Sequence, residues 1–242
     1  MINSRNWFSN ISIFSDGADL KKMKQSYETG LVNGFTTNPS LMKKAGVTDY
    51  LKFAKEAVDI FPNLSISFEV FGDDVNDIKR EAHILTNLGR NVFVKIPIIS
   101  IHGTSNAKII EELSSEEIKL NITAVTTISQ VEEAVDSFGL NTENYVSIFV
   151  GRLNDVGIET GEFVKQSKKI CEKKKNTKLL WASTRELYNI KQAKELGCDI
   201  ITVPPELIDK LNTNEKSAIS VSLDTVRGFQ KDIESLGFSI EE

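Results

Sequence analysis

Cysteine and histidine are scarce in this sequence, and this scarcity limits the chemistry that it can carry. Its 242 residues include two cysteines, Cys171 and Cys198, and two histidines, His83 and His102, in unrelated positions. Two cysteines are too few for a disulfide framework or for a zinc site built on thiolates. The sequence therefore predicts a reducing, cytoplasmic setting and no metal centre, and it leaves open only a magnesium site made of carboxylates.

Long apolar runs and a basic surface are also absent. No stretch approaches the roughly 18 apolar residues that a membrane-spanning helix needs, and no secretory signal is recognisable. The formal net charge is −5, so neither nucleic acid nor a membrane is an expected partner. A basic run at residues 168–176 falls at the end of a predicted helix, where cations suit the helix dipole. Self-association into a homo-oligomer is left open.

What is present is a regular alternation of short apolar runs with longer amphipathic segments. Such alternation predicts parallel strands joined by right-handed helical crossovers. The first strand is not followed by G-x-G-x-x-G, and G-x-x-x-x-G-K-[ST] does not occur, so an open nucleotide-binding sheet is disfavoured. The predicted strands cover residues 10–15, 32–38, 64–71, 91–97, 118–125, 144–150, 177–183 and 198–204.

Eight strand–helix units in a chain of this length predict the α/β class and a single (β/α)8 TIM barrel. The whole chain, 1–242, is predicted to be one domain, with its core at about 11–211 and an extra C-terminal helix at about 217–236.

Polar side chains lie at or just past the ends of successive predicted strands. In a barrel these carboxyl ends form one mouth, where catalytic residues gather. One polar residue on a strand is usually unremarkable, but such residues on seven successive strands predict a site. The residues are Asp16, Thr36, Asn38, Glu69, Lys95, Asn121, Thr123, Ser147, Arg152, Ser183 and Arg185.

Lys95 lies in an otherwise apolar strand, "VFVKIP" (92–97). A lysine there is costly unless it is paired or gives up its proton. The alternative is a lysine whose stem packs in the core while its amine reaches water. Inside a barrel we favour function, because a neutral amine is a nucleophile that forms a Schiff base with a ketone or an aldehyde.

The other charged residues each have a structural alternative. Alternation in "SISFE" places Ser65, Ser67 and Glu69 on the lumen face, where Glu69 either pairs with Lys95 or shuttles protons for it. Asp16 is a helix-cap candidate, but Asp19 suits that cap equally well.

Three further positions have structural alternatives of their own. Asn38 precedes Pro39, so a turn would explain it. Arg152 and Arg185 are either solvated or form a clamp for phosphate, and the helix start that follows Ser183 also favours an anion.

Six motifs follow one another along the chain: "GFTTNPSL" (34–41), "VFVKIP" (92–97), "LNIT" (120–123), "VSIFVGR" (146–152), "WASTR" (181–185) and "GCDIITVP" (197–204). In this order they resemble the motifs of the transaldolase family, including its small subfamily with the fructose-6-phosphate aldolases. The resemblance covers roughly residues 11–211.

The resemblance implies a cofactor-free class I aldolase barrel. In that family Lys95 would form the Schiff base, and Asp16 would be the acid and base of carbon–carbon cleavage. Glu69 and Thr123 would hold the catalytic water. Thr36, Asn38, Asn121, Ser147 and Phe149 would lie around the dihydroxyacetone unit, and Arg152, Ser183 and Arg185 would bind phosphate.

Two residues bear on the reaction. The resembling fructose-6-phosphate aldolases carry tyrosine where this chain has Phe149, and glutamine where it has Glu69. The expected activity is therefore transaldolase: transfer of dihydroxyacetone between sugar phosphates, as in the pentose phosphate pathway. The alternatives are an aldolase that releases dihydroxyacetone, a transaldolase homologue for an unusual sugar, and a non-catalytic sugar-phosphate-binding barrel. Gly17, where the family usually has threonine, leaves the substrate open.

Overall fold

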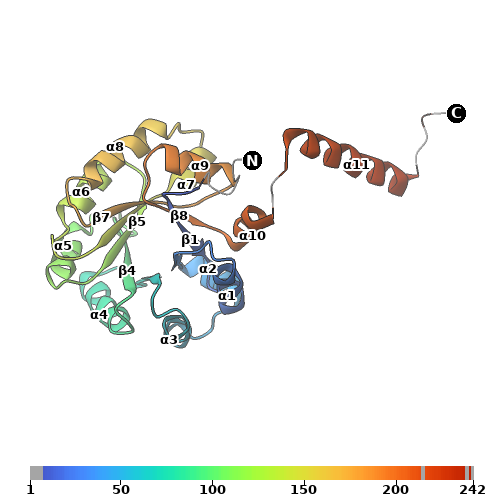
Figure 1. The fold of residues 1–242 in the computed structure, drawn as a ribbon. Helices are drawn as coiled ribbons and strands as arrows, with labels where there is room; N and C mark the ends of the chain where they lie inside the picture. Colours follow the sequence, from blue (N-terminus) through green and yellow to red (C-terminus); the bar gives the residue numbers. More distant parts are fainter. Residues whose placement is uncertain (1–7, 214–215, 238–239, 241–242) are drawn as a thin grey trace.

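Eight parallel strands close into a barrel in sequence order, with β8 paired to β1 (Figure 1). This architecture is seen in a computed structural model that describes residues 8–213, 216–237 and 240. The predicted (β/α)8 barrel with an extra C-terminal helix is confirmed. The strands are β1 (Ser12–Asp16), β2 (Gly34–Thr36), β3 (Ser65–Glu69), β4 (Val92–Pro97), β5 (Leu120–Val125), β6 (Asn144–Ile148), β7 (Thr177–Trp181) and β8 (Ile200–Val203).

The one-domain assignment of 1–242 stays a prediction, and residues 1–7, 214–215, 238–239 and 241–242 of that range lie outside the described residues. The helices are α1 (Leu20–Glu28), α2 (Pro39–Ala45), α3 (Tyr50–Ile60), α4 (Val75–Thr86), α5 (Ala107–Ser115), α6 (Ile128–Asp136), α7 (Val150–Asp155), α8 (Gly161–Cys171), α9 (Tyr188–Glu195), α10 (Pro205–Thr213) and α11 (Ala218–Leu236).

Two short helices, α2 and α7, were not predicted. The predicted strand 144–150 ends at Ile148, and Val150 already begins α7. The sequence hides this boundary because Val150 extends the apolar run of β6. Both short helices directly follow strands, so they lie at the barrel mouth.

Local capping fixes where the helices begin. Asp19 accepts hydrogen bonds from two backbone amides at the start of α1, so Asp19 and not Asp16 caps this helix. Asn38 caps α2, with Pro39 at the first helical position, where a missing N–H costs nothing. Thr127 and Gln130 form a capping box at α6. Helices α1, α2 and α6 therefore begin within a few residues of the strands that precede them, at the barrel mouth.

The core has two layers. The outer layer lies between strands and helices, and Phe68 of β3 makes edge-on contacts there with Tyr50 and Phe53 of α3. The inner cluster fills the barrel interior and consists of Phe14, Phe93, Tyr145, Leu180, Ala182 and Ile200. Phe93 stacks on Tyr145 with 4.0 Å between ring centroids. This cluster lies under the polar residues of the mouth, as expected for a packed barrel.

Helix α11 departs from the barrel and projects away from it (Figure 1). None of its residues is buried, although its apolar side chains recur at helical spacing. Those side chains are Ile219, Val221, Leu223, Val226, Phe229, Ile233 and Leu236, each about half exposed or more. Among the described residues no helix is both long and apolar enough to cross a membrane.

Candidate active site

A cavity of about 490 Å³ opens at the carboxyl ends of the strands. The predicted site residues line it, except Asn121, which lies completely buried next to it. The structure therefore brings together side chains from seven strands and their loops: Asp16, Thr36, Asn38, Glu69, Lys95, Thr123, Ser147, Phe149, Arg152, Ser183 and Arg185.

Lys95 lies at the centre of this group and is 5% exposed. Its Nζ is 3.1 Å from Glu69 Oε2, and it donates a hydrogen bond of 3.1 Å to the Thr37 carbonyl. The pairing follows from the sheet, because Glu69 and Lys95 are register partners on β3 and β4. The Tyr50 hydroxyl donates to the backbone carbonyl of Glu69 at 2.7 Å, which ties α3 to this strand end. Lys95 is therefore paired with a carboxylate, and this carboxylate is a proton acceptor next to the amine.

Asp16 faces the same cavity from β1. Its Oδ1 accepts a hydrogen bond of 2.9 Å from the Thr36 hydroxyl. Burial raises the pKa of the Asp16 carboxyl above its ordinary value, while the Lys95 cation and the Thr36 hydrogen bond pull the pKa down and Glu69 pushes it up. A carboxyl with a raised pKa holds a proton more readily than a free aspartate, which suits a group that accepts a proton and later returns it.

Thr123 is held by a bulge in β5. The register with β6 shifts between Ile122 and Val125, and Ala124 has a left-handed backbone with φ of 58°. Thr123 Oγ1 is buried and has no hydrogen-bond partner among the described residues. Buried hydroxyls normally find a partner, so this oxygen is suited to hold a water or a substrate atom in the cavity.

A hydrogen-bond chain crosses the barrel just below the cavity floor. Ser147 Oγ donates to Asn121 Oδ1 at 2.7 Å, and Asn121 Nδ2 donates to Ser67 Oγ at 2.9 Å. The chain fixes the Asn121 amide and leaves Ser147 at the cavity surface. Asn38 also reaches the cavity, although its side-chain oxygen caps α2 by accepting from Leu41 N at 3.0 Å.

Both arginines are exposed at one side of the mouth, where the loops after β6 and β7 touch. A Cβ on Gly151 would lie 1.7 Å from the Ser183 carbonyl oxygen, so only glycine allows this approach. Ser183 itself has a left-handed backbone with φ of 65°. Arg185 makes a two-pronged pair with Asp155 of α7, at 3.2 and 2.5 Å, and this pair holds the pKa of Asp155 below its ordinary value. Arg152, Ser183 and Arg185 thus converge.

Phe149 packs against the inner cluster and lines the cavity beside Ser147. No tyrosine is present among the described residues that line this cavity. The aromatic ring at this position therefore brings no hydroxyl to the lysine.

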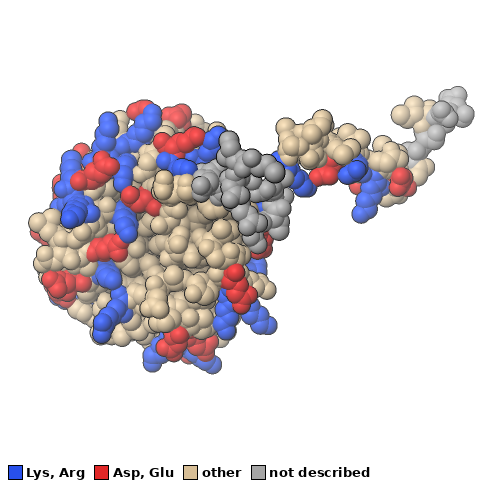
Figure 2. All heavy atoms as spheres, viewed as in Figure 1, with Lys and Arg blue, Asp and Glu red and all other residues tan. Residues whose placement is uncertain are grey.

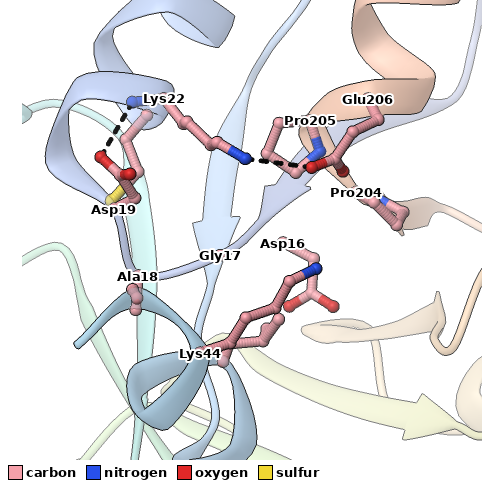
Figure 3. Close-up of a pocket in the computed structure, with 12 residues that line it drawn as sticks. Asp16, Gly17, Ala18, Asp19, Lys22, Lys44, Pro204, Pro205 and Glu206 are labelled. Carbon is pink, nitrogen blue, oxygen red and sulfur yellow. Dashed lines mark hydrogen bonds and ion pairs between the residues drawn. The ribbon is translucent and has the colours of Figure 1, made fainter. Parts of the chain in front are cut away.

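A smaller cavity, of about 180 Å³, lies outside the barrel between α1, α2 and the start of α10 (Figure 3). It shares Asp16, Leu41 and Pro204 with the main cavity. An ion pair of 3.1 Å between Lys22 and Glu206 lies on its wall. Gly17 leaves room there, because a Cβ would only touch Pro205 at 3.8 Å.

The remaining reactive side chains lie elsewhere. Cys171 and Cys198 are both buried free thiols, and burial raises the pKa of Cys171 to about 12, so this thiol stays protonated and inert. Within the described part of the chain, no three His, Cys, Asp or Glu side chains are grouped so that they could hold a metal ion.

The sequence reasoning missed several residues of this site. Thr202 of β8 lines the cavity, as do Ala124, Thr184 and Pro204. The Thr37 carbonyl and the Tyr50 hydroxyl contact the central pair from outside the predicted set. The sequence pattern could have predicted Thr202. Each of the other seven strands has a candidate polar residue at or just past its end, and Thr202 is the polar residue near the end of the eighth strand.

Comparison with known proteins agrees with this geometry. The family description "Transaldolase/Fructose-6-phosphate aldolase" matches residues 13–240. A probable transaldolase of Methanococcus maripaludis is 34% identical over 202 residues, which cover 83% of this chain and 89% of that protein. Probable transaldolases of Chelativorans sp. (32% identity, 83% and 88% covered) and Nitrosopumilus maritimus (34%, 83% and 87%) are similar to a comparable degree.

A solved structure shares the fold alone. The crystal structure of 2,3-dimethylmalate lyase, a PEP mutase/isocitrate lyase superfamily member, superposes with a TM-score of 0.56 at 12% sequence identity. The match covers 96% of this chain and 86% of that one. The family match and the curated relatives carry the assignment further than the fold does: the chain belongs to the transaldolase/fructose-6-phosphate aldolase family.

Proposed function

We propose that this chain is a transaldolase that carries a dihydroxyacetone unit on Lys95 as a Schiff base. The proposed reaction converts sedoheptulose 7-phosphate and glyceraldehyde 3-phosphate into erythrose 4-phosphate and fructose 6-phosphate. The observation that carries the proposal is the buried Lys95 amine, paired with Glu69 at 3.1 Å inside a cavity that Asp16 also lines.

Schiff-base formation begins with the Lys95–Glu69 pair. Glu69 takes a proton from the ammonium group, and the neutral amine adds to the C2 ketone of the sugar. The carbinolamine then loses water to give an iminium ion. Glu69 supplies the proton for this departure through a water held at the buried Thr123 hydroxyl, whose oxygen has no protein partner among the described residues.

Carbon–carbon cleavage follows at Asp16. The carboxylate accepts the proton of the C4 hydroxyl, the C3–C4 bond breaks, and its electron pair flows to the iminium to form a neutral enamine. The field of Lys95 explains the timing. A positive charge at Lys95 lowers the pKa of Asp16 and so favours the ionised carboxyl, and loss of that charge in the enamine favours the protonated carboxyl. The acceptor aldehyde reverses these steps, and water then releases the product.

The rest of the cavity orients the sugars. We propose that Thr36, Asn38, Asn121 and Ser147 surround the dihydroxyacetone hydroxyls, and that Arg152, Ser183 and Arg185 bind the phosphate at the opposite end. The lysine itself provides the electron sink, so no cofactor or metal takes part in the scheme. The substrates would place the enzyme in the cytoplasmic pentose phosphate pathway.

Self-association is a further part of the proposal. The apolar side chains of α11 are buried against no other part of the described chain, and most helical stability in proteins comes from packing of an apolar face. A second copy of the chain would cover this stripe.

An acceptor-dependence assay tests the function. With fructose 6-phosphate and erythrose 4-phosphate, we expect sedoheptulose 7-phosphate to form, and little free dihydroxyacetone when the aldehyde is left out. Brisk release without acceptor would instead identify an aldolase. No reaction and no lysine adduct with these sugars would favour a homologue for another sugar or a binding protein.

A further inference from the structure

Three side chains on adjacent strands form a hydroxyl chain that ends at Asp16. Thr202 of β8 and Thr36 of β2 are both almost fully buried, and their Oγ1 atoms lie 2.5 Å apart. Thr36 Oγ1 is also 2.9 Å from Asp16 Oδ1 on the intervening strand, β1. Thr202 was not among the predicted site residues, and it lines the cavity.

The number of available protons decides which hydroxyl donates to which in this hydroxyl chain. An ionised carboxylate only accepts hydrogen bonds, and each hydroxyl has one proton to donate. When Asp16 is ionised, the Thr36 proton is therefore used on Asp16, and the proton between the two threonines comes from Thr202. When Asp16 is protonated, its own proton needs an acceptor, and Thr36 can supply one by turning its hydroxyl toward Thr202. The order of donors thus reverses with the protonation of Asp16.

We propose that Thr202 is a positioning residue for Asp16. Its hydroxyl donates to Thr36 and so commits the Thr36 proton to the ionised carboxylate, and its oxygen accepts a hydrogen bond from Thr36 once Asp16 is protonated. The inference rests on the proposed function, in which Asp16 takes one proton during cleavage and returns it when the acceptor aldehyde adds. Thr202 touches neither the lysine nor the carboxylate, so it acts through Thr36.

The other charged groups around Asp16 are the same in wild-type protein and in the Thr202 variants. Lys95 on β4 and Glu69 on β3 face it across the main cavity. The side cavity that Asp16 shares is also lined by Asp19 and Lys22 of the α1 region, Lys44 of α2 and Glu206 of α10. None of these groups is altered by a substitution at Thr202, so a change in the titration of Asp16 would report the hydroxyl chain.

The test is a titration of Asp16 by carbon NMR of aspartate-labelled protein, with the Asp16 signal assigned by its loss in Asp16→Asn. Thr202→Val removes the hydroxyl and keeps the side-chain shape, and Thr202→Ala is a second variant should valine disturb the fold. Hydrogen bonds that support an ionised carboxylate are stronger than those that support a neutral carboxyl, so loss of the Thr202 hydroxyl costs the ionised state more. We therefore expect the Asp16 midpoint to move to higher pH in both variants, and to return to the wild-type value in Thr202→Ser. Thr177→Val, which alters a buried threonine at the first residue of β7, is the control and should leave the midpoint unchanged.

The same variants should show the effect in turnover. In Thr202→Val, kcat/KM for transfer should fall about 3–10-fold at the acid side of the pH profile, the range expected for one hydrogen bond, and much less at the alkaline side. An unchanged Asp16 midpoint in Thr202→Val and Thr202→Ala, or no recovery in Thr202→Ser, would overturn the role of Thr202. The NMR titration needs no turnover, so it separates this inference from the proposed function, which fails instead if wild-type protein forms no Lys95 adduct.

Discussion

At the scale of single residues, Asp16 shows a conflict between stability and function. Burial raises the pKa of this carboxyl, so holding it ionised at neutral pH costs the folded state free energy. Between its ordinary pKa and the raised pKa, the folded protein binds more protons than the unfolded chain, so stability falls as pH rises through this window. Above the raised pKa the full penalty remains.

Asp16→Asn should therefore stabilise the protein at pH 7–8 while abolishing transfer, because the neutral amide carries no such penalty. The gain in the free energy of unfolding should shrink as pH falls toward 4. Urea unfolding of wild type and variant across this pH range measures the gain in the free energy of unfolding. Asp19→Asn is the control, since asparagine caps a helix as well as aspartate does. A variant less stable than wild type at pH 8 would show that the carboxylate is a net stabilising group.

Phe149 is the residue that we expect to decide whether dihydroxyacetone is transferred to an acceptor or released. Phe149→Tyr adds a hydroxyl at the cavity surface beside Ser147. We expect more free dihydroxyacetone from fructose 6-phosphate without acceptor, since a positioned acid contributes typically about 10²–10⁴-fold and even poor alignment should be visible. Tyr145→Phe, which removes the hydroxyl that donates to Ser65 below the cavity, should leave the partition unchanged. Equal release by wild type and Phe149→Tyr would argue against the proton-supply explanation.

At the scale of elements, the backbone of α7 lies close against the loop after β7 at Gly151 and Ser183. A methyl group at Gly151 would overlap the Ser183 carbonyl oxygen, and backbone has little freedom to give way. We expect Gly151→Ala to lower the free energy of unfolding by about 1–3 kcal/mol, the usual cost of overpacking. Since Arg152 and Ser183 flank this contact, the KM for phosphorylated sugars should also rise.

Thermal unfolding and steady-state kinetics measure both effects of Gly151→Ala. The matched control is Gly228→Ala on α11, where a Cβ meets open space and a helical alanine is favourable. If Gly151→Ala is less stable but its KM is unchanged, the contact between Gly151 and Ser183 has no role in phosphate binding, and this part of the prediction is wrong.

Strand and helix periodicity predicted the barrel because its core is regular, with polar residues at one end of each strand and apolar ones along its length. Periodicity could not find α2 or α7, because they have only 7 and 6 residues and begin inside runs that look like strands or turns. Nor could it show that Arg185 pairs with Asp155 or that Thr202 bonds Thr36, because both contacts join elements distant in sequence. Threonine is an ordinary strand residue, so Thr202 looked like part of the sheet.

At the scale of the whole molecule, α11 is the feature that a lone chain does not explain. In Figure 2 charges of both signs surround the barrel, whereas α11 has an uncharged upper side and carries its charged side chains along its lower side. A double change of Phe229 and Ile233 to serine should lower the molar mass measured by light scattering and leave the barrel's circular dichroism intact. Arg227→Ser, on an exposed position of the same helix, is the control. A wild-type protein that is monomeric at high concentration would contradict self-association through α11.

The central claim is that Lys95 carries the substrate, and borohydride trapping tests it most directly. Protein incubated with fructose 6-phosphate and borohydride is digested, and the modified peptide is located by mass spectrometry. The account predicts a stable adduct on Lys95, and neither adduct nor turnover in a folded Lys95→Met variant. An adduct on a different lysine, or turnover retained by Lys95→Met, would contradict it.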